Sequence, residues 1–316
     1  MSETEILPGP PPCEVHHRFA HVNGVRLHYV EALPQPATEN GRGSASGRLC
    51  LALHGFPEFW YSWRHQIAVL AAAGFRAVAP DLRGYNLSDK PPGISAYRME
   101  VLLEDVAGLI RHTGEEKAVL VGHDWGGAIA WYFAMRHAEM VERLIILNAP
   151  HPAAFRRELR SWTQLRKSWY MFILQAPGLP EQLLGFGDHD LLGRMLRRQP
   201  VHSEAFTPED VQRYKHALAR PGALTAALNY YRALGNPLRA AEREVVPVIT
   251  PTLLLWGEQD AYLSPRLTEG LDAWVPNLRV VRFPDASHWI QNDAPEQVNR
   301  LMIDFLHDLP RSTPSL

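Results

Sequence analysis

The chain contains a series of short apolar runs, each ending in a loop, and this series most limits the folds open to it. Continuous apolar runs are typical of strands buried on both faces of a parallel sheet. Stretches with helical periodicity separate them, which predicts a mostly parallel, doubly wound α/β sheet. The expected strands are residues 49–53, 76–79, 118–121, 143–147, 252–256 and 278–283, and the expected helices are 63–73, 100–112, 126–137, 265–274 and 295–307.

The alternation stops between residues 151 and 244, where helical patterns occur without a clear strand. An all-helical insertion in such a fold is typical of a cap, or lid, over the carboxyl ends of the strands, where open α/β sheets bind ligands. We therefore expect an α/β core of residues 16–150 and 245–316, a helical cap of residues 151–244, and a disordered tail of residues 1–15. Within the core, Asn23-Gly24 predicts a β-hairpin.

Charge and cysteine content exclude several classes of function. The 316 residues carry 32 Lys and Arg against 34 Asp and Glu, a formal net charge of -2, so neither nucleic acid nor an anionic membrane is an expected partner. The two cysteines, Cys13 and Cys50, form no metal-ligand spacing. We expect a cytoplasmic protein without a metal or an organic cofactor, and its state as a monomer or a homodimer stays open.

The strongest local signal is Gly122-His-Asp124-Trp-Gly126, which follows a buried strand and precedes a helix. Gly-x-nucleophile-x-Gly at such a place is the nucleophile-elbow pattern, here with Asp where Ser is usual. The glycines permit a sharp turn that exposes the central side chain above the sheet, where the helix N-terminus stabilises an anion. Asp124 is therefore the candidate nucleophile, although Asp is also a good residue for simply capping a helix.

A second motif, His54-Gly55-Phe56-Pro57, follows the strand expected at 49–53. A turn there directs a backbone N–H toward the elbow. The amides of Phe56 and Trp125 would then form an oxyanion hole for a tetrahedral intermediate. In isolation, the same residues suit an ordinary turn equally well.

Two further candidates follow later strands. Asp260 comes after the strand expected at 252–256 and His288 after the strand at 278–283, which gives the order nucleophile, acid, histidine. Asp285 and Asp293 lie nearer to His288 in the sequence, but we expect them on a solvated loop and at the start of the next helix.

Taken together, these segments resemble the soluble epoxide hydrolase family of the α/β-hydrolase fold. The likeness runs from about residue 19 to residue 306. Ser287 and Asn86 depart from the family pattern, which often has glycine at these positions. The segments that carry it are His54-Gly-Phe-Pro-Glu-Phe-Trp-Tyr-Ser-Trp-Arg64, Asp81-Leu-Arg-Gly-Tyr-Asn-Leu-Ser88, Gly122-His-Asp-Trp-Gly-Gly127 and Ser287-His-Trp289.

The resemblance also implies two cap tyrosines that donate hydrogen bonds to an epoxide oxygen. The segment Asn229-Tyr230-Tyr231-Arg232 resembles the second tyrosine site of the family and assigns Tyr231. The turn Gln175-Ala-Pro-Gly178 points to Tyr170 as the first. A packing role, which is common for aromatic residues in cap helices, is the alternative for both.

The implied reaction converts an epoxide and water to a vicinal diol in two steps. Asp124 would attack a ring carbon and form an alkyl ester while Tyr170 and Tyr231 assist ring opening. His288, oriented by Asp260, would then activate the water that hydrolyses the ester.

The sequence leaves the substrate itself unidentified, although the aromatic cap predicts an apolar pocket. We expect the side chains of Phe56, Trp125 and Trp289 to contact the substrate. Two other functions stay open: a haloalkane dehalogenase with the same Asp nucleophile, and a non-enzymatic ligand receptor on the same fold. The paired tyrosines favour an epoxide over a haloalkane.

Overall fold

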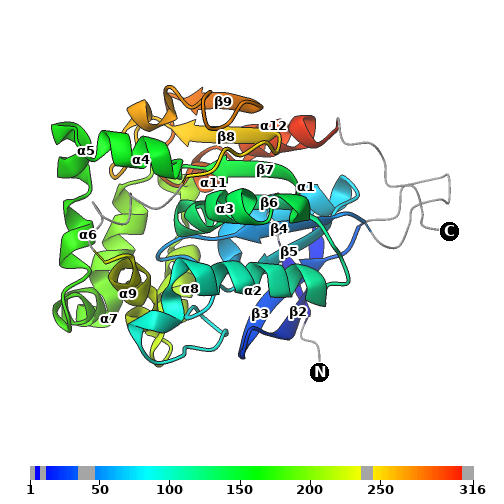
Figure 1. Ribbon diagram of the computed structural model, residues 1–316. Helices are drawn as coiled ribbons and strands as arrows, with labels where there is room; N and C mark the ends of the chain where they lie inside the picture. The colour runs from blue at the N-terminus through cyan, green and yellow to red at the C-terminus, as the bar shows by residue number, and fades with distance from the viewer. Residues whose placement is uncertain (1–3, 8–11, 35–46, 236–244, 308–316) are drawn as a thin grey trace.

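The computed structural model describes residues 4–7, 12–34, 47–235 and 245–307. Its centre is a nine-stranded sheet in the order β1-β2-β3-β5-β4-β6-β7-β8-β9 (Figure 1). Strands β1 to β3 are antiparallel, β3 also pairs antiparallel with β5, and the strands from β5 to β9 are parallel. The strands are β1 (Thr4–Leu7), β2 (Cys13–Val22), β3 (Val25–Ala32), β4 (Leu49–Leu53), β5 (Arg76–Pro80), β6 (Ala118–His123), β7 (Val141–Leu147), β8 (Thr252–Gly257) and β9 (Leu278–Phe283).

Helices cover both faces of the sheet, which confirms the expected doubly wound α/β fold. Helices α2 and α3 lie on one face, and α1 and α12 lie on the other (Figure 1). The central strands β4 and β6 are buried along their whole length. The core helices are α1 (Arg64–Ala72), α2 (Met99–His112), α3 (Asp124–Arg136), α11 (Ile290–Asp293) and α12 (Pro295–His307), with 3-10 turns at Trp60–Trp63, Ile94–Tyr97, Ala138–Met140 and Pro265–Thr268.

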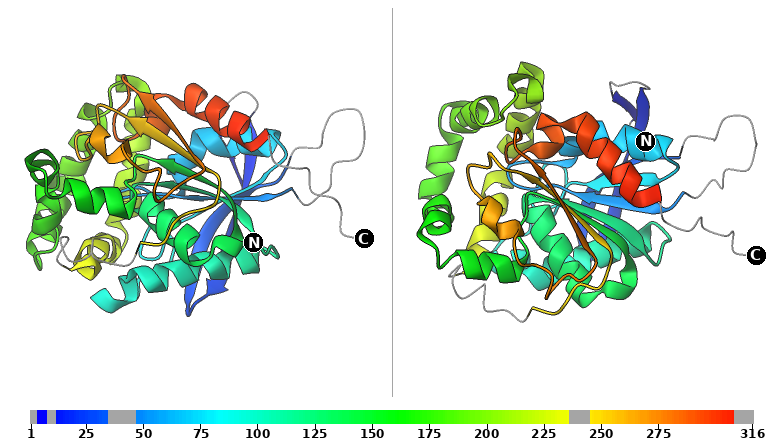
Figure 2. Two further views of the ribbon diagram at one scale, coloured as in Figure 1. Left: turned by 45° about the horizontal axis from the view of Figure 1, so that its top comes forward. Right: turned by 90° about the horizontal axis from the view of Figure 1, so that it is seen from above.

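The described residues between β7 and β8 form helices and turns and contain no strand. These helices lie together at one end of the sheet, and Figure 2 shows the same placement from two further directions. We refer to them as the helical insertion. They are α4 (Pro152–Glu158), α5 (Trp162–Lys167), α6 (Trp169–Ile173), α7 (Leu179–Arg198), α8 (Pro208–Ala219) and α9 (Ala223–Leu234), with a 3-10 turn at Ser203–Ala205. The expected boundary at residue 244 lies outside the described residues.

The hairpin expected at Asn23-Gly24 joins β2 to β3. The φ angles of Asn23 and Gly24 are 46° and 74°. Two successive residues with positive φ are the geometry of a type I′ turn, which matches the twist of the flanking strands. The prediction is confirmed.

The disordered tail expected at residues 1–15 is wrong for part of that segment. Thr4–Leu7 forms β1 and pairs with the beginning of β2, which itself starts at Cys13. The side chain of Glu5 accepts a hydrogen bond from Arg213 of α8, 2.9 Å away. Strand β1 thus depends on pairing with β2 and on a side chain 208 residues away in the sequence, and the local composition gave no sign of either contact.

The helix expected at residues 265–274 is also wrong. Only the turn Pro265–Thr268 forms, because Glu269 adopts extended angles and Gly270 has a φ of 61°. The side chain of Arg157 in α4 donates to the carbonyl oxygens of Arg266 and Glu269. The insertion therefore satisfies carbonyl groups that a continued helix would have paired internally.

The order in which the parallel strands are added to the sheet reverses at β4, since β5 lies on one side of it and β6 on the other. At such a switch point, the loops that leave the two neighbouring strands diverge and open a crevice at their carboxyl ends. The loops after β4 and β6 carry Phe56 and Asp124. The topology thus places the two main sequence motifs at one crevice.

Candidate active site

Asp124 lies at the sharp turn between β6 and α3. Its φ of 49° is unusual for a residue other than glycine and is typical of strained functional turns. The turn packs tightly against the end of β4, because a Cβ on Gly126 would lie 2.1 Å from the carbonyl oxygen of Leu53. The glycine is therefore needed for the close approach that holds the Asp124 side chain above the sheet.

The carboxylate of Asp124 is fixed by the neighbouring loop. Its Oδ1 accepts a hydrogen bond of 2.8 Å from the backbone N–H of Phe56. A Cβ on Gly55 would lie 2.4 Å from the Cβ of Asp124, so this position also has to be glycine. The Phe56 amide thus lies where the predicted oxyanion hole would need a donor, and the oxyanion roles of the Phe56 and Trp125 amides stay predictions.

His288 and Asp260 meet beside Asp124. The Nδ1 of His288 lies 2.7 Å from Asp260 Oδ2, and its Nε2 lies 3.6 Å from Asp124 Oδ2. Asp260 Oδ1 accepts from the backbone amides of Tyr262 and Leu263. With its Nδ1 donating to Asp260, His288 directs its other nitrogen at the carboxylate of Asp124.

Electrostatics tie the state of His288 to its two carboxylate neighbours. Burial lowers the pKa of His288, but the charge of Asp260 and the hydrogen bond and charge of Asp124 outweigh it and raise the pKa to about 10. Burial raises the pKa of Asp260, yet the charge and hydrogen bond of His288 and the amide of Asn148 bring it below its usual value. With both carboxylates ionised, His288 is an imidazolium at neutral pH.

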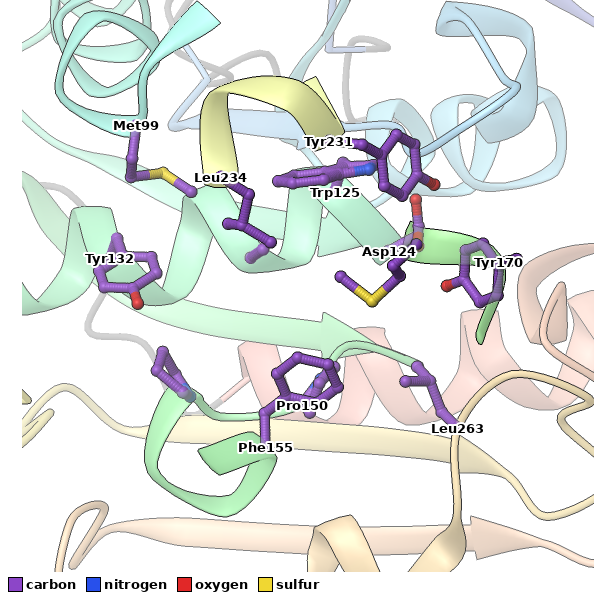
Figure 3. A pocket seen from close by; sticks show the side chains of 13 residues that line it. Met99, Asp124, Trp125, Tyr132, Pro150, Phe155, Tyr170, Tyr231, Leu234 and Leu263 are labelled. Atoms are coloured by element: carbon purple, nitrogen blue, oxygen red, sulfur yellow. The ribbon is translucent and has the colours of Figure 1, made fainter. Parts of the chain in front are cut away.

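Tyr170 and Tyr231 come together from α6 and α9. Their ring centroids are 6.2 Å apart, and both side chains line the same cavity as Asp124. Figure 3 shows both hydroxyl groups on the side of their rings that faces Asp124. The two tyrosines predicted from separate segments thus converge on the candidate nucleophile.

Both tyrosines are neutral at ordinary pH. Burial and then the charge of Asp124 raise the pKa of Tyr170 well above 10. Burial, Tyr170 and Asp124 do the same for Tyr231, against a hydrogen bond from Trp125. A neutral phenol keeps its proton and can donate a hydrogen bond to an electronegative atom bound beside Asp124.

The cavity is apolar apart from these groups. Its volume, with the mouth included, is about 780 Å³. Figure 3 shows Asp124 and Tyr170 toward one end and Tyr132 and Met99 toward the other. The lining residues are Met99, Asp124, Trp125, Ala128, Tyr132, Pro150, Pro152, Phe155, Tyr170, Met171, Tyr231, Leu234 and Leu263.

The three side chains expected to contact a substrate have different positions. Trp125 lines the cavity. Phe56 is not among the lining residues, and its ring packs edge-on against Tyr231, with centroids 5.6 Å apart. Trp289 is buried against Phe206, Tyr262 and His288, away from the lining. Neither Phe56 nor Trp289 thus lines this cavity, and their predicted contacts with a substrate stay predictions.

Sequence reasoning missed a buried polar pair beneath the site. His123 Nδ1 lies 2.7 Å from Glu58 Oε2, and His123 Nε2 lies 2.9 Å from the carbonyl oxygen of His288. Burial raises the pKa of Glu58, but His123, Ser62 and the amide of Gly55 reduce it to about 2. This pair links the loop after β4 to the loop that carries His288. Both residues lie inside motif segments of the sequence, but those motifs gave no sign that the two side chains meet.

Asn148 is a second missed residue. It directly follows β7 and has a φ of 37°, and asparagine tolerates such angles better than most residues. Its amide donates to Asp260 Oδ2 at 2.8 Å and its oxygen accepts from the amide of Gly257. Asn148 thus fixes the acid in place. An asparagine directly after a buried strand was the available signal.

The aspartates near His288 have other roles. Asp285 is exposed, as expected, but Asp293 is buried and its carboxylate accepts from the amides of Ser287 and His202.

Asn86, at a common glycine position, has a φ of 39° and donates to Asp81. The hydroxyl of Ser287, the other departure from the family pattern, accepts a hydrogen bond of 3.2 Å from the Trp289 amide.

The residues that the structure describes contain neither a metal-binding cluster nor a membrane-spanning helix. No group of three or more His, Cys, Asp or Glu side chains there is arranged to hold a metal ion. No helix in the same part of the chain is long and apolar enough to cross a membrane.

Comparison with known proteins gave a consistent set of similarities. Residues 51–295 match the family described as alpha/beta hydrolase fold. The chain is 42% identical to AB hydrolase superfamily protein YfhM of Bacillus subtilis (strain 168), over 92% of this chain and 97% of the relative. It is 42% identical to Epoxide hydrolase 3 of Xenopus tropicalis, over 90% of this chain and 76% of the relative.

Solved structures give the same result. A mutant of an epoxide hydrolase from Bacillus megaterium, complexed with its product, a naphthyloxy-propane-1,2-diol, superimposes with a TM-score of 0.82. It is 36% identical in sequence, and the match covers 92% of this chain and 100% of that chain.

Proposed function

The chain belongs to the epoxide hydrolases of the α/β-hydrolase fold, and we propose that it acts through a covalent ester on Asp124. The proposal rests on the groups that surround the carboxylate of Asp124. Its Oδ1 accepts from the Phe56 amide, its Oδ2 faces His288, and two neutral tyrosines share its cavity.

In the first step, Oδ2 of Asp124 attacks a ring carbon and the bond between that carbon and the ring oxygen breaks. An ionised carboxylate needs no base for this attack. Tyr170 and Tyr231 donate hydrogen bonds to the ring oxygen, which gains negative charge as the ring opens and then takes the proton of one tyrosine hydroxyl. The imidazolium of His288, whose pKa falls once Asp124 is esterified, gives up the proton that restores this phenol. The products of the step are an alkyl ester of Asp124 and a neighbouring hydroxyl group.

In the second step, His288 removes a proton from water, and the resulting hydroxide attacks Cγ of the ester. Negative charge forms on Oδ1, where the Phe56 amide already donates and where the Trp125 amide would complete an oxyanion hole. The acyl bond then breaks, and the departing diol oxygen takes the proton from His288. The carboxylic acid left on Asp124 gives its proton to His288, which restores the Asp124 carboxylate and the imidazolium. One epoxide and one water give one diol.

We propose that the helical insertion acts as a cap. It supplies Tyr170 and Tyr231 together with apolar lining such as Met171 and Leu234, while the core supplies Asp124. Closing a site with apolar residues excludes bulk water and strengthens the electrostatic interactions inside it. The catalytic site is therefore complete only where cap and core meet.

The shape of the cavity supports epoxides with one apolar substituent as substrates. Asp124, Ala128 and Tyr132 follow one face of α3 at intervals of four residues and form a floor roughly 12 Å long, at 1.5 Å per residue. Because the reacting group lies toward one end, a tail would extend from one ring carbon along this floor. The product bound by the Bacillus megaterium enzyme is a propane-1,2-diol with one aromatic substituent.

A single turnover with excess enzyme in ¹⁸O-labelled water tests the covalent step. The first diol is expected to carry unlabelled oxygen, since its new oxygen comes from Asp124. The His288→Gln variant is expected to accumulate a mass increase equal to that of the epoxide, while Asp285→Asn, an exposed change in the same loop, turns over normally. Full label in the first diol would mean direct attack by water.

The other proposed features have simpler tests. Halide release from haloalkanes at a rate comparable to diol formation from epoxides would favour the hypothesis that the chain is a haloalkane dehalogenase. The predicted cytoplasmic location would be checked by cell fractionation, and the oligomeric state by sedimentation.

A further inference from the structure

The outer face of the helical insertion carries exposed apolar side chains on α5, α6 and α7. Trp162, Trp169 and Phe186 are 76%, 59% and 81% exposed. Single exposed apolar side chains are ordinary, whereas a cluster of them marks an interaction surface. Figures 1 and 2 place these helices at the edge of the molecule away from the sheet. We define the apolar patch as Trp162, Trp169, Phe172, Ile173, Leu183 and Phe186.

Helix α6 separates the patch from the catalytic cavity. Its residues Tyr170 and Met171 line the cavity, while Trp169, Phe172 and Ile173 are exposed on the outside. One short helix thus has an apolar inner face and an apolar outer face. Packing against the cavity explains the inner face alone, so the outer face needs another explanation.

Phe186 projects from a bend in α7. The backbone leaves helical geometry at Phe186, and Gly187, Asp188 and His189 all have positive φ. The flanking Gly185 and Gly187 carry no side chain that could cover the Phe186 ring. A protruding aromatic ring is better suited to insertion into a fluid layer such as lipid than to a flat contact with a second copy of the chain.

The charges around the patch are mainly positive. Arg160 and Arg166 are exposed on either side of Trp162 in the sequence, and neither forms an ion pair with another described residue. The nearby carboxylate of Glu181 is paired with Arg232, 2.8 Å away, and that of Asp188 with Lys215, 2.6 Å away. Two copies joined through this face would bring like charges together, whereas an anionic surface would complement them.

We propose that the apolar patch docks the enzyme on an anionic lipid surface. Trp162, Trp169 and Phe186 would enter the boundary between headgroups and acyl chains, and Arg160 and Arg166 would contact the headgroups. This revises the sequence-based expectation that no membrane is a partner, because the net charge of the whole chain conceals a local surplus. An apolar epoxide dissolved in lipid would then lie close to the cavity behind α6.

Cosedimentation of the full chain with vesicles of phosphatidylcholine and phosphatidylglycerol tests the proposal. We expect binding to these vesicles, little binding to phosphatidylcholine alone, and weaker binding as salt rises. Trp162 and Trp169 are the most exposed of the nine tryptophans, so a blue shift of the emission should accompany binding. Arg160→Gln and Arg166→Gln should each weaken binding roughly fivefold.

The double variant Trp162→Ser/Phe186→Ser is expected to lose at least about tenfold in vesicle affinity. The matched control is Ile249→Ser, because Ile249 is 65% exposed but lies outside the patch. Both variants should hydrolyse a water-soluble epoxide at the wild-type rate, which separates this proposal from the catalytic one. Wild-type binding by the double variant, or no binding by the wild type, would overturn it. So would a wild-type dimer in lipid-free sedimentation that the double variant abolishes.

Discussion

At the scale of single residues, the charge on His288 depends on whether Asp124 is free or esterified. With both carboxylates ionised, the pKa of His288 is about 10, so the resting side chain is protonated. Ester formation removes the charge of Asp124, one of the causes of that elevation, and so lowers the pKa of His288. The first step thus prepares the base that the second step requires.

The two steps are therefore expected to differ in their pH dependence. Ester hydrolysis needs neutral His288, so its rate should rise with pH through the pKa that His288 has in the ester and then level off. Alkylation needs an ionised Asp124 and neutral tyrosines, and should stay nearly constant over the same range. Single-turnover stopped-flow measurements resolve both rates. A hydrolysis rate independent of pH throughout the neutral range would contradict this coupling.

The tyrosine hydroxyls are expected to act only on ring opening. Tyr170→Phe or Tyr231→Phe removes one donor and keeps the ring packing, so the alkylation rate should fall by about 10 to 10³, as for loss of one oxyanion donor. The double variant should nearly abolish ring opening. Tyr132→Phe, at the far end of the cavity, is the matched control. Double-variant rates within a few-fold of wild type would return both residues to packing roles.

At the scale of elements, the parallel strands were predictable because each is a continuous apolar run. All six expected strands form, within a few residues of the predicted ends. The failures have tertiary causes. Strand β1 depends on pairing with β2, and the helix expected at 265–274 is interrupted where Arg157 of α4 binds its carbonyl groups.

In the site too, residues placed by local sequence patterns were predictable, whereas those placed by tertiary contacts were not. Asp124, Asp260 and His288 each end a strand or follow one in a recognisable order, and the structure brings them together. Asn148 and the pair of Glu58 and His123 hold these groups through contacts between distant loops. A short motif does not indicate which distant residues contact it. The positioning roles of Asn148, Glu58 and His123 could therefore be seen only in the packing.

The junction of β6 and α3 is expected to tolerate no side chain at Gly126. In Gly126→Ala, the new Cβ would lie 2.1 Å from the Leu53 carbonyl oxygen, so the backbone of the elbow or of β4 has to move. We expect a loss of ~1–3 kcal/mol in unfolding free energy and a large loss of activity. Gly185→Ala is the control, since its Cβ would meet only Leu224 at 3.8 Å. Equal stability of both variants in urea titrations would refute this account.

At the scale of the whole molecule, the insertion is attached to the core through buried polar contacts. Asp210 of α8 accepts from Tyr61 at 2.9 Å and lies 3.4 Å from Arg64. The hydroxyl of Tyr230 in α9 donates to the carbonyl oxygen of Arg83. These contacts hold α9, and therefore Tyr231, at a fixed height above the sheet. The distance between cap and core thus sets the width of the cavity.

Because α3 forms the floor of that cavity, a larger side chain at its midpoint should shorten it. Ala128 lies between Asp124 and Tyr132 on the lining face, so Ala128→Leu would block a long tail and leave the catalytic groups in place. We expect kcat/KM for long-chain or aryloxy terminal epoxides to fall at least about tenfold, which corresponds to ~1.4 kcal/mol of transition-state stabilisation.

Short substrates provide the internal control for this prediction. Propylene oxide has no tail that could reach Ala128, so its kcat/KM should stay within a few-fold of wild type. Phe155→Ala, which enlarges the opposite wall, should restore part of the long-tail activity in the double variant, because the displaced tail regains space. If Ala128→Leu slowed short and long epoxides equally, the change would have disturbed Asp124 itself. The tail would then have to occupy a different part of the cavity.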